Sequence, residues 1–110
     1  MKRFPSLKSS KEFAVVYNNA DSFANRNLVM YKSKNSLDKN RIGISVSKKV
    51  GNSVVRHRLT RLIREIFRLN SPYFEGYDIV VVIRVAAANC SYKELENSYI
   101  KLSKLHKDKI

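Results

Sequence analysis

The sequence predicts an α+β fold, a two-layer sandwich in which three helices pack on a small mixed sheet of about four strands. Three patterns in the chain support this prediction. Residues 41–47 alternate between aliphatic and small side chains, as a half-buried strand does. Residues 53–69 have the apolar periodicity of a long amphipathic helix. The continuous aliphatic run at residues 79–83 predicts a strand buried on both faces.

Two capping boxes predict where the first and last helices begin. Ser9 and Glu12 have the required spacing near the N-terminus, and Ser91 and Glu94 have it near the other end. Apolar residues at helical spacing follow each box: Phe13, Val16, Tyr17 and Ala20 in the first helix, and Leu95, Tyr99 and Leu102 in the last.

The strands are predicted from alternation and from apolar runs. We expect them at residues 22–24, 28–34, 41–47 and 78–84, with a polar loop at residues 34–40. The helix at 53–69 follows a turn that contains Gly51 and ends before Pro72, because proline cannot continue a helix. The predicted order is helix, two or three strands, helix, strand, helix.

Length and charge limit the classes of protein that remain. The 110 residues fit one domain, residues 1–110, with flexible ends expected at 1–8 and 106–110. The chain has 22 basic and 9 acidic residues and a net charge of +13, which indicates a polyanionic partner, either a nucleic acid or an anionic membrane surface.

Cys90 is the single cysteine, so an intramolecular disulfide or a cysteine-based zinc site is excluded. No apolar run has the length of a signal peptide core or a membrane span, so we expect a soluble cytoplasmic protein.

The helix predicted at 53–69 is divided into an apolar face and an arginine face. On a helical wheel the apolar face holds Val55, Leu59, Leu62, Ile63, Ile66, Phe67 and Leu69. The opposite face holds five arginines and His57, and Glu65 is the single acidic residue of the helix. A solvated charged face is the simpler alternative. However, a solvated face usually mixes charges, and arginines bind phosphate groups bidentately, so we favour binding to a nucleic acid.

RNA is the more consistent nucleic acid partner. No helix-turn-helix or dimer seam that would support reading of a DNA major groove is evident. Proteins bind RNA through its phosphates and shape, and they stack aromatic rings on unpaired bases. Phe13, Tyr17 and Tyr31 are candidates for stacking, with an ordinary core position as the alternative. Gly43, Ser45 and Ser47 form a face of small side chains, which is either plain exposed sheet or the floor of a groove.

Residues 45–65 resemble the signature of the bacterial ribonuclease P protein family. That signature runs from a strand through Lys-Lys and a glycine turn into a helix with an Arg-Asn-Arg triplet and then Arg-Leu-Ile-Arg. The resemblance extends to Phe13, to Ala24-Asn25-Arg26, to Val29 and Tyr31, and to the closing helix, so it spans nearly the whole chain. Two positions differ: His57 replaces the central asparagine of the triplet, and Thr60 replaces a lysine often found two residues after it.

The resemblance implies the fold of ribosomal protein S5 domain 2, with a left-handed strand–helix–strand crossover over residues 41–84. It implies the protein subunit of ribonuclease P, whose partners are the catalytic RNA, in a one-to-one complex, and precursor tRNA. The RNA cleaves with bound Mg2+, so no catalytic or metal-binding residue is expected in the protein. By matching position, the contacts to the RNA subunit fall on Lys48, Lys49, Asn52, Arg56, His57, Arg58, Arg61, Arg64 and Arg68. A cleft for the single-stranded 5′ leader of precursor tRNA falls on Phe13, Tyr17, Tyr31, Gly43, Ser45 and Ser47.

Other readings of the charge remain open at this level. A ribosomal or other structural RNA-binding protein shares the size and the charge, and a cationic membrane-surface protein is a third candidate. A self-contained nuclease is disfavoured, because the acidic residues are scattered and neither His57 nor His106 has an evident partner in the sequence.

Overall fold

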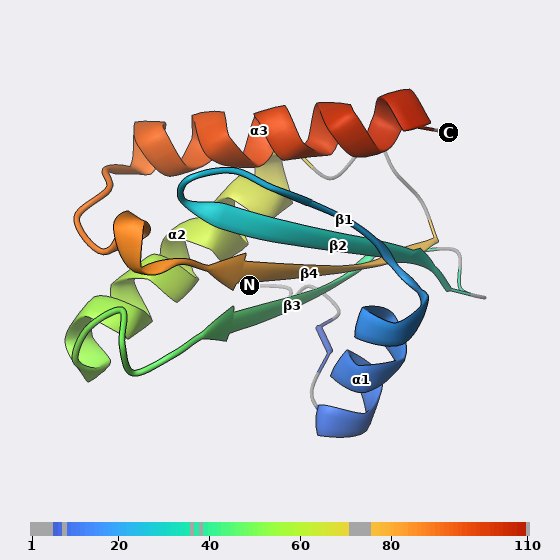
Figure 1. Ribbon diagram of the computed structural model, residues 1–110, viewed down its shortest axis with the longest axis horizontal. Helices are drawn as coiled ribbons and strands as arrows, with labels where there is room; N and C mark the ends of the chain where they lie inside the picture. The colour runs from blue at the N-terminus through green and yellow to red at the C-terminus, as the bar shows by residue number, and fades with distance from the viewer. Residues whose placement is uncertain (1–5, 8, 36, 38, 71–75, 110) are drawn as a thin grey trace.

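The structure is a computed structural model that describes residues 6–7, 9–35, 37, 39–70 and 76–109 (Figure 1). Its elements, in chain order, are α1 (Ser10–Asn19), β1 (Asp21–Ala24), β2 (Leu28–Lys34), β3 (Arg41–Val46), α2 (Ser53–Asn70), β4 (Tyr77–Ile83), the 3-10 helix η2 (Val85–Ala87) and α3 (Tyr92–Lys109). The predicted α+β class and the predicted element order are confirmed. In the part of the chain that the structure describes, no helix is long and apolar enough to cross a membrane.

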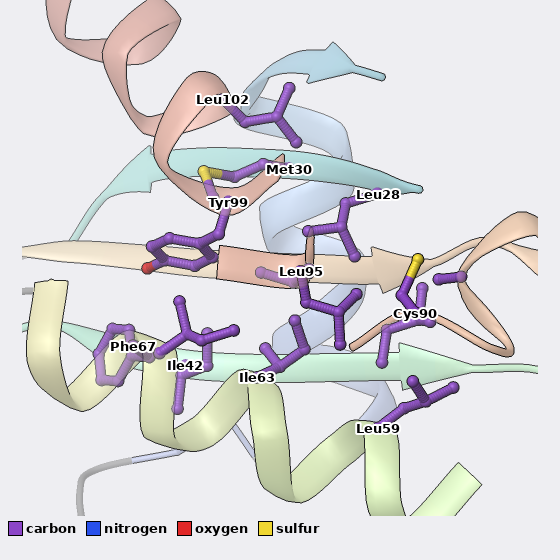
Figure 2. Packing of buried hydrophobic residues seen from close by; sticks show 14 of the residues in the cluster. Leu28, Met30, Ile42, Leu59, Ile63, Phe67, Cys90, Leu95, Tyr99 and Leu102 are labelled. Atoms are coloured by element: carbon purple, nitrogen blue, oxygen red, sulfur yellow. The ribbon is translucent and has the colours of Figure 1, made fainter. Parts of the chain in front are cut away.

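The four strands form one mixed sheet in the order β1-β2-β4-β3. β2 is antiparallel to both of its neighbours, whereas β3 and β4 are parallel and are connected through α2. In Figure 1 α2 passes behind the two parallel strands, and Figure 2 shows the same connection from the other side. Both views give a left-handed crossover, an exception to the usual right-handed rule and the hand that the family resemblance implies.

α2 and α3 cover one face of the sheet and bury the main core with it (Figure 2). α2 contributes Leu59, Ile63, Ile66 and Phe67, all of which are buried as the helical periodicity predicts. α3 contributes Leu95, Tyr99 and Leu102, and the sheet contributes the alternate residues of its strands, such as Leu28 and Met30. This burial of aliphatic and aromatic surface is the main source of the stability of the domain.

α1 covers only part of the opposite face of the sheet. Its Val16 packs with Leu7 and with Val80 of β4 in a second, smaller core. Four residues are partly buried against this cluster: Phe13, Ala20, Tyr31 and Val82. Because one short helix cannot cover four strands, part of this face stays open beside α1, and the site described below lies there.

Two details differ from the sequence-based predictions. Leu69 was predicted on the apolar face of α2 but is 50% exposed, because it lies at the border of that face in the last turn of the helix. The helix η2 was not predicted, since a three-residue 3-10 turn has little sequence signature. Leu7 and His106, which belong to the ends expected to be flexible, are buried. Of those ends, residues 1–5, 8 and 110 lie outside the described residues.

Two charged residues are buried in the sheet, Asp78 on β4 and Lys32 on β2. The side chain of Lys32 on β2 is 6% exposed, and its Nζ lies 4.2 Å from the centroid of the Tyr77 ring. The charged ammonium is favoured by the ring but loses hydration on burial, and burial lowers the pKa of Lys32 from 10.5 to about 8.

This burial predicts a pH-dependent stability. Because the pKa is lower in the folded state, the unfolded chain binds more protons at Lys32 between pH 8 and pH 10.5, and the stability rises with pH in that window. Replacing Lys32 by Met removes this dependence. Lys32→Met should therefore have a higher free energy of unfolding than the wild type, and the difference should be largest below pH 8 and shrink toward pH 10.5. Urea unfolding at several pH values measures this difference. Lys34→Met, at an exposed position of the same strand, is the matched control. A gain for Lys32→Met that is constant with pH would contradict the assignment.

Candidate nucleic-acid interface

The arginine face of α2 begins at a well-defined cap. The Oδ1 atom of Asn52 accepts a hydrogen bond from the backbone N–H of Val55 at 3.0 Å, as an N-cap residue does. The preceding turn requires a glycine, because a β-carbon at Gly51 would lie 2.9 Å from Cβ of Val55. Asn52 therefore fixes the start of the helix and remains exposed beside Lys48 and Lys49, which are exposed as well. All three predicted contact residues lie on this loop.

The basic side chains of α2 fall into two groups. His57, Arg61 and Arg64 are exposed and make no hydrogen bond or ion pair with the residues that the structure describes. The other arginines already use part of their donor capacity: Arg56 Nε donates to the carbonyl of Gly51 at 3.2 Å, Arg58 Nη2 donates to the carbonyl of Cys90 at 2.9 Å, and Arg68 is ion-paired with Glu65.

The pair formed by Arg68 and Glu65 affects the charge of the whole face. The hydrogen bond from Arg68 lowers the pKa of the Glu65 carboxyl, so this carboxylate stays ionised and bound to its neighbour. The acidic residue of α2 is thereby engaged near the end of the helix. The first turns present the guanidinium groups of Arg56 and Arg61 and the imidazole of His57, and no carboxylate of the helix is paired with them.

A groove lies between α1 and the open face of the sheet. It has a volume of about 380 Å³ and is lined by Ser9, Ser10, Phe13, Ala14, Tyr17 and Ser45. Tyr17 is 39% exposed, and its ring is 6.3 Å from that of Phe13 and 4.8 Å from that of Tyr31, which it meets edge-on. Aromatic rings and serine hydroxyls therefore lie together in one shallow surface.

The strand residues predicted as the groove floor have different positions. Ser45 lines the groove, and Ser47 is exposed just beyond the end of β3. Gly43 is buried, because the ring of Phe13 and the side chain of Leu7 pack directly over it. Gly43 thus shapes the groove by giving room to the Phe13 ring, while the surface open to a ligand is provided by its neighbours.

α1 is held against the sheet by a network of ion pairs. Arg41 on β3 donates two hydrogen bonds to the Asp78 carboxylate on β4, at 2.8 and 2.7 Å. The same guanidinium donates through Nη1 to Glu12 at 2.9 Å. Glu12 in turn completes the capping box of α1, since it accepts from the N–H of Ser9 at 3.1 Å. The hydrogen bond with Asp78 raises the pKa of Arg41, so the guanidinium stays charged.

Sequence reasoning did not identify this network or the lining by Ser10 and Ala14. The capping box signalled one half of it, at Ser9 and Glu12. The pairing of Arg41 with Asp78 depends on the parallel alignment of β3 and β4, in which these residues are opposite partners. No local pattern in the sequence indicates that alignment.

The sequence is similar to one family of known proteins over most of its length. The family model described as Ribonuclease P matches residues 1–107. The ribonuclease P protein component of Lachnoclostridium phytofermentans is 56% identical over 103 residues, which are 93% of this chain and 89% of that protein. The ribonuclease P protein component of Clostridium kluyveri is 50% identical over 101 residues, which are 89% of this chain and 90% of that protein.

Solved structures show the same similarity in three dimensions. The RNase P protein of Staphylococcus aureus superposes with a TM-score of 0.88 at 35% identity, over 96% of this chain and 97% of that one. The RNase P protein of Thermotoga maritima superposes with a TM-score of 0.81 at 29% identity, over 88% of this chain and 93% of that one. The similarity thus covers both the sequence and the fold over nearly the full length.

The contact between Gly43 and Phe13 predicts a coupled pair. A β-carbon at Gly43 would lie 2.8 Å from Cζ of Phe13 and 3.1 Å from Cδ1 of Leu7. Gly43→Ala should therefore lower the free energy of unfolding by about 1–3 kcal/mol. Phe13→Leu removes the clashing ring, so the double variant should be less destabilised than the sum of the two single variants, by roughly 0.5–3 kcal/mol.

Chemical denaturation of the four proteins measures this coupling. Ser45→Ala, at the next position of β3 on the same face, is the matched control and should change stability by less than about 0.5 kcal/mol. Additive effects of Gly43→Ala and Phe13→Leu would show that the Phe13 ring does not limit the space above Gly43.

Proposed function

The chain belongs to the ribonuclease P protein family and is the protein subunit of this RNA-based endoribonuclease, which acts in the maturation of tRNA 5′ ends; from this premise we propose which of its surfaces binds which RNA. The exposed face of α2 binds the RNA subunit, and the groove beside α1 binds the single-stranded 5′ leader of precursor tRNA. The observation that carries the proposal is that α2, which bears the charged face, and α1, which borders the aromatic groove, lie on opposite sides of one sheet (Figure 1).

The face of α2 has the chemistry of a phosphate-binding surface. Arg61 and Arg64 expose guanidinium groups with no partner among the described residues, and each can form two parallel hydrogen bonds to a phosphate. Lys48 and Lys49 add two further exposed charges in the loop before the helix. Like charges on one helix repel one another, and a bound polyanion removes this repulsion. These properties favour the phosphate backbone of a folded RNA as the ligand.

The groove beside α1 has the chemistry of a single-strand site. Unpaired bases stack on aromatic rings, and Tyr17 offers a partly exposed ring supported by Phe13 and Tyr31. Ser9, Ser10 and Ser45 add hydroxyl groups that can donate to and accept from bases, riboses or phosphates. The nearby carboxylate of Glu12 is bound to Arg41, which reduces its repulsion of an incoming phosphate.

The separation of the two surfaces allows both RNAs to be bound at once. α1 lies in front of the sheet in Figure 1, whereas α2 lies behind it. A leader in the groove therefore does not compete with the RNA subunit for α2. We propose a complex of one protein with one RNA subunit and one precursor tRNA, assembled in the cytoplasm.

We propose that the Mg2+ ions of the holoenzyme are bound mainly by RNA. Four of the described carboxylates are engaged in other contacts: Glu12 and Asp78 with Arg41, Glu65 with Arg68, and Glu94 with the backbone N–H of Ser91. Among the described residues no three His, Cys, Asp or Glu side chains form a group that could hold a metal ion. The contribution of this chain is electrostatic: its positive charges reduce the repulsion between the phosphates of the two RNAs.

The first prediction of this proposal concerns salt dependence. Each phosphate contact releases counterions, so Arg61→Ala and Arg64→Ala should each weaken binding to the RNA subunit and reduce the slope of log affinity against log salt by about one unit. Filter binding or fluorescence titration at several salt concentrations measures this slope. Lys101→Ala removes one exposed charge from α3 and should leave the slope nearly unchanged. Unchanged slopes in both arginine variants would mean that the α2 face is only solvated.

The second prediction concerns the leader. Tyr17→Ala removes the exposed ring of the groove and should weaken holoenzyme binding of leader-bearing tRNA by roughly 1–3 kcal/mol, with much less effect on leaderless tRNA. Tyr31→Phe keeps the ring that supports Tyr17 and should be close to the wild type. Val15→Ala, also on α1 and 53% exposed, is the matched control for a surface truncation. The measured quantity is the ratio of the two affinities. If Tyr17→Ala folds normally and leaves this ratio unchanged, the leader does not lie on this ring.

A further inference from the structure

The turn between β1 and β2, residues 25–27, is fixed by the side chain of its first residue. Asn25 Oδ1 accepts hydrogen bonds from the backbone N–H groups of Asn27 at 3.1 Å and Leu28 at 3.0 Å. The backbone N–H of Asn25 donates to the carbonyl of Leu28 at 2.9 Å. An asparagine that bonds to the backbone two residues further on is a specific way of building a tight turn.

The same turn is also tied to two other elements. Both asparagine side chains of the turn bind Ser98 on α3. The side-chain amide of Asn25 donates to the Ser98 carbonyl at 3.0 Å, and that of Asn27 donates to the Ser98 hydroxyl at 2.9 Å. Beyond β4, Arg84 donates from its backbone N–H to the carbonyl of Asn27 and from Nη1 to the carbonyl of Asn25, both at 2.9 Å. Contacts from both sides therefore hold the turn in one conformation.

Arg26 lies at the tip of this turn. Its side chain is exposed and makes no hydrogen bond or ion pair with the described residues, whereas its two neighbours in the chain are bound on both sides. The hydrogen bonds around the turn therefore position a single guanidinium that is directed to no partner within the described chain. Fixing the backbone in advance lowers the entropy cost of binding a ligand there.

Two other arginines are hydrogen-bonded to this turn or to the segment that follows β4. Arg84 is bound to the carbonyl of Asn25 in the same turn, and Arg58 of α2 is bound to the carbonyl of Cys90. Burial raises the pKa of the Cys90 thiol and Glu94 raises it further, while the charges of Arg26 and Arg58 both oppose this increase. The turn that carries Arg26 is thus bonded to Arg84, the first residue of segment 84–90, and Arg58 is bonded to Cys90, the last residue of that segment. The carboxylate of Glu94 lies in this region as well and accepts from the N–H of Ser91.

These contacts place the arginines at one end of the sheet. In Figure 1 the β1–β2 turn, η2 and the first turns of α2 lie at the same end of the molecule. Arg58 belongs both to this cluster and to α2, so the cluster adjoins the arginine face of that helix. The cluster thus combines residues from three separate parts of the chain.

We propose that Arg26, with Arg84 and Arg58, forms a second phosphate-binding site that continues the α2 face around the end of the sheet and binds the sugar–phosphate backbone of the RNA subunit. The proposal rests on the proposed function of the α2 face and extends it to residues outside that helix. A guanidinium has five N–H donors in a fixed fork, so Arg84 and Arg58 can keep their carbonyl contacts and still bind phosphate oxygens. Arg26 has all of its donors available for the RNA.

Arg26→Ala tests the proposal with little risk to the fold, because the side chain contributes no contact to the turn. We expect weaker binding to the RNA subunit and a salt slope reduced by about one unit. Thermal unfolding of the free protein should be unchanged. Arg61→Ala is measured in parallel as the test of the α2 face, and Lys101→Ala as the control for loss of one exposed charge.

The outcomes separate the two proposals. If Arg61→Ala reduces the slope and Arg26→Ala behaves like Lys101→Ala, the second site is refuted and the α2 face stands. If neither arginine variant differs from Lys101→Ala, the proposed function of the α2 face fails as well. If Arg26→Ala leaves binding of the RNA subunit intact and weakens only the binding of precursor tRNA to the holoenzyme, the ligand is the substrate and the proposal is overturned.

Discussion

The guanidinium of Arg41 is the interaction on which the arrangement of this domain most depends. Its bidentate contact with Asp78 joins the parallel strands β3 and β4, and its contact with Glu12 joins both strands to the capping box of α1. Burial of apolar surface, as in the small cluster beneath α1, is not directional. The hydrogen-bonded charged contacts are directional, and they tie α1 to the two strands beside which the groove lies.

Much of the fold could be predicted from the sequence, because helices and strands leave local patterns. The capping boxes at Ser9 and Ser91 and the buried stripe of α2 correspond to the structure closely. What could not be predicted depends on contacts between distant segments. The pairing of Arg41 with Asp78, the Phe13 ring above Gly43 and the bond from Arg58 to Cys90 each join residues about 30 or more positions apart. The hand of the crossover was accessible through family resemblance, since no residue pattern encodes it.

The candidate site shows the same division. The sequence identifies which side chains are basic and which helix face they share, but it does not show which of them are already engaged. In the structure Arg61 and Arg64 have no partner among the described residues. Arg58 and Arg68, in contrast, already bind the Cys90 carbonyl and Glu65 within the domain. It also shows that one short helix leaves the groove face open, whereas the two long helices close the other face. The left-handed crossover keeps α2 and α1 on opposite sides of the sheet.

The central position of β4 has a consequence for the synthesis of the chain. β4 is the last strand to be made, yet it pairs with β2 on one side and with β3 on the other. Until residue 83 has left the ribosome, β2 and β3 each have an unpaired edge, and the sheet is incomplete. α1, the β1–β2 hairpin and α2 precede β4 in the chain, but without β4 the sheet cannot close. The main core also needs α3, which follows β4, so the domain is completed late, after one aliphatic strand has joined two parts of the sheet that were made earlier.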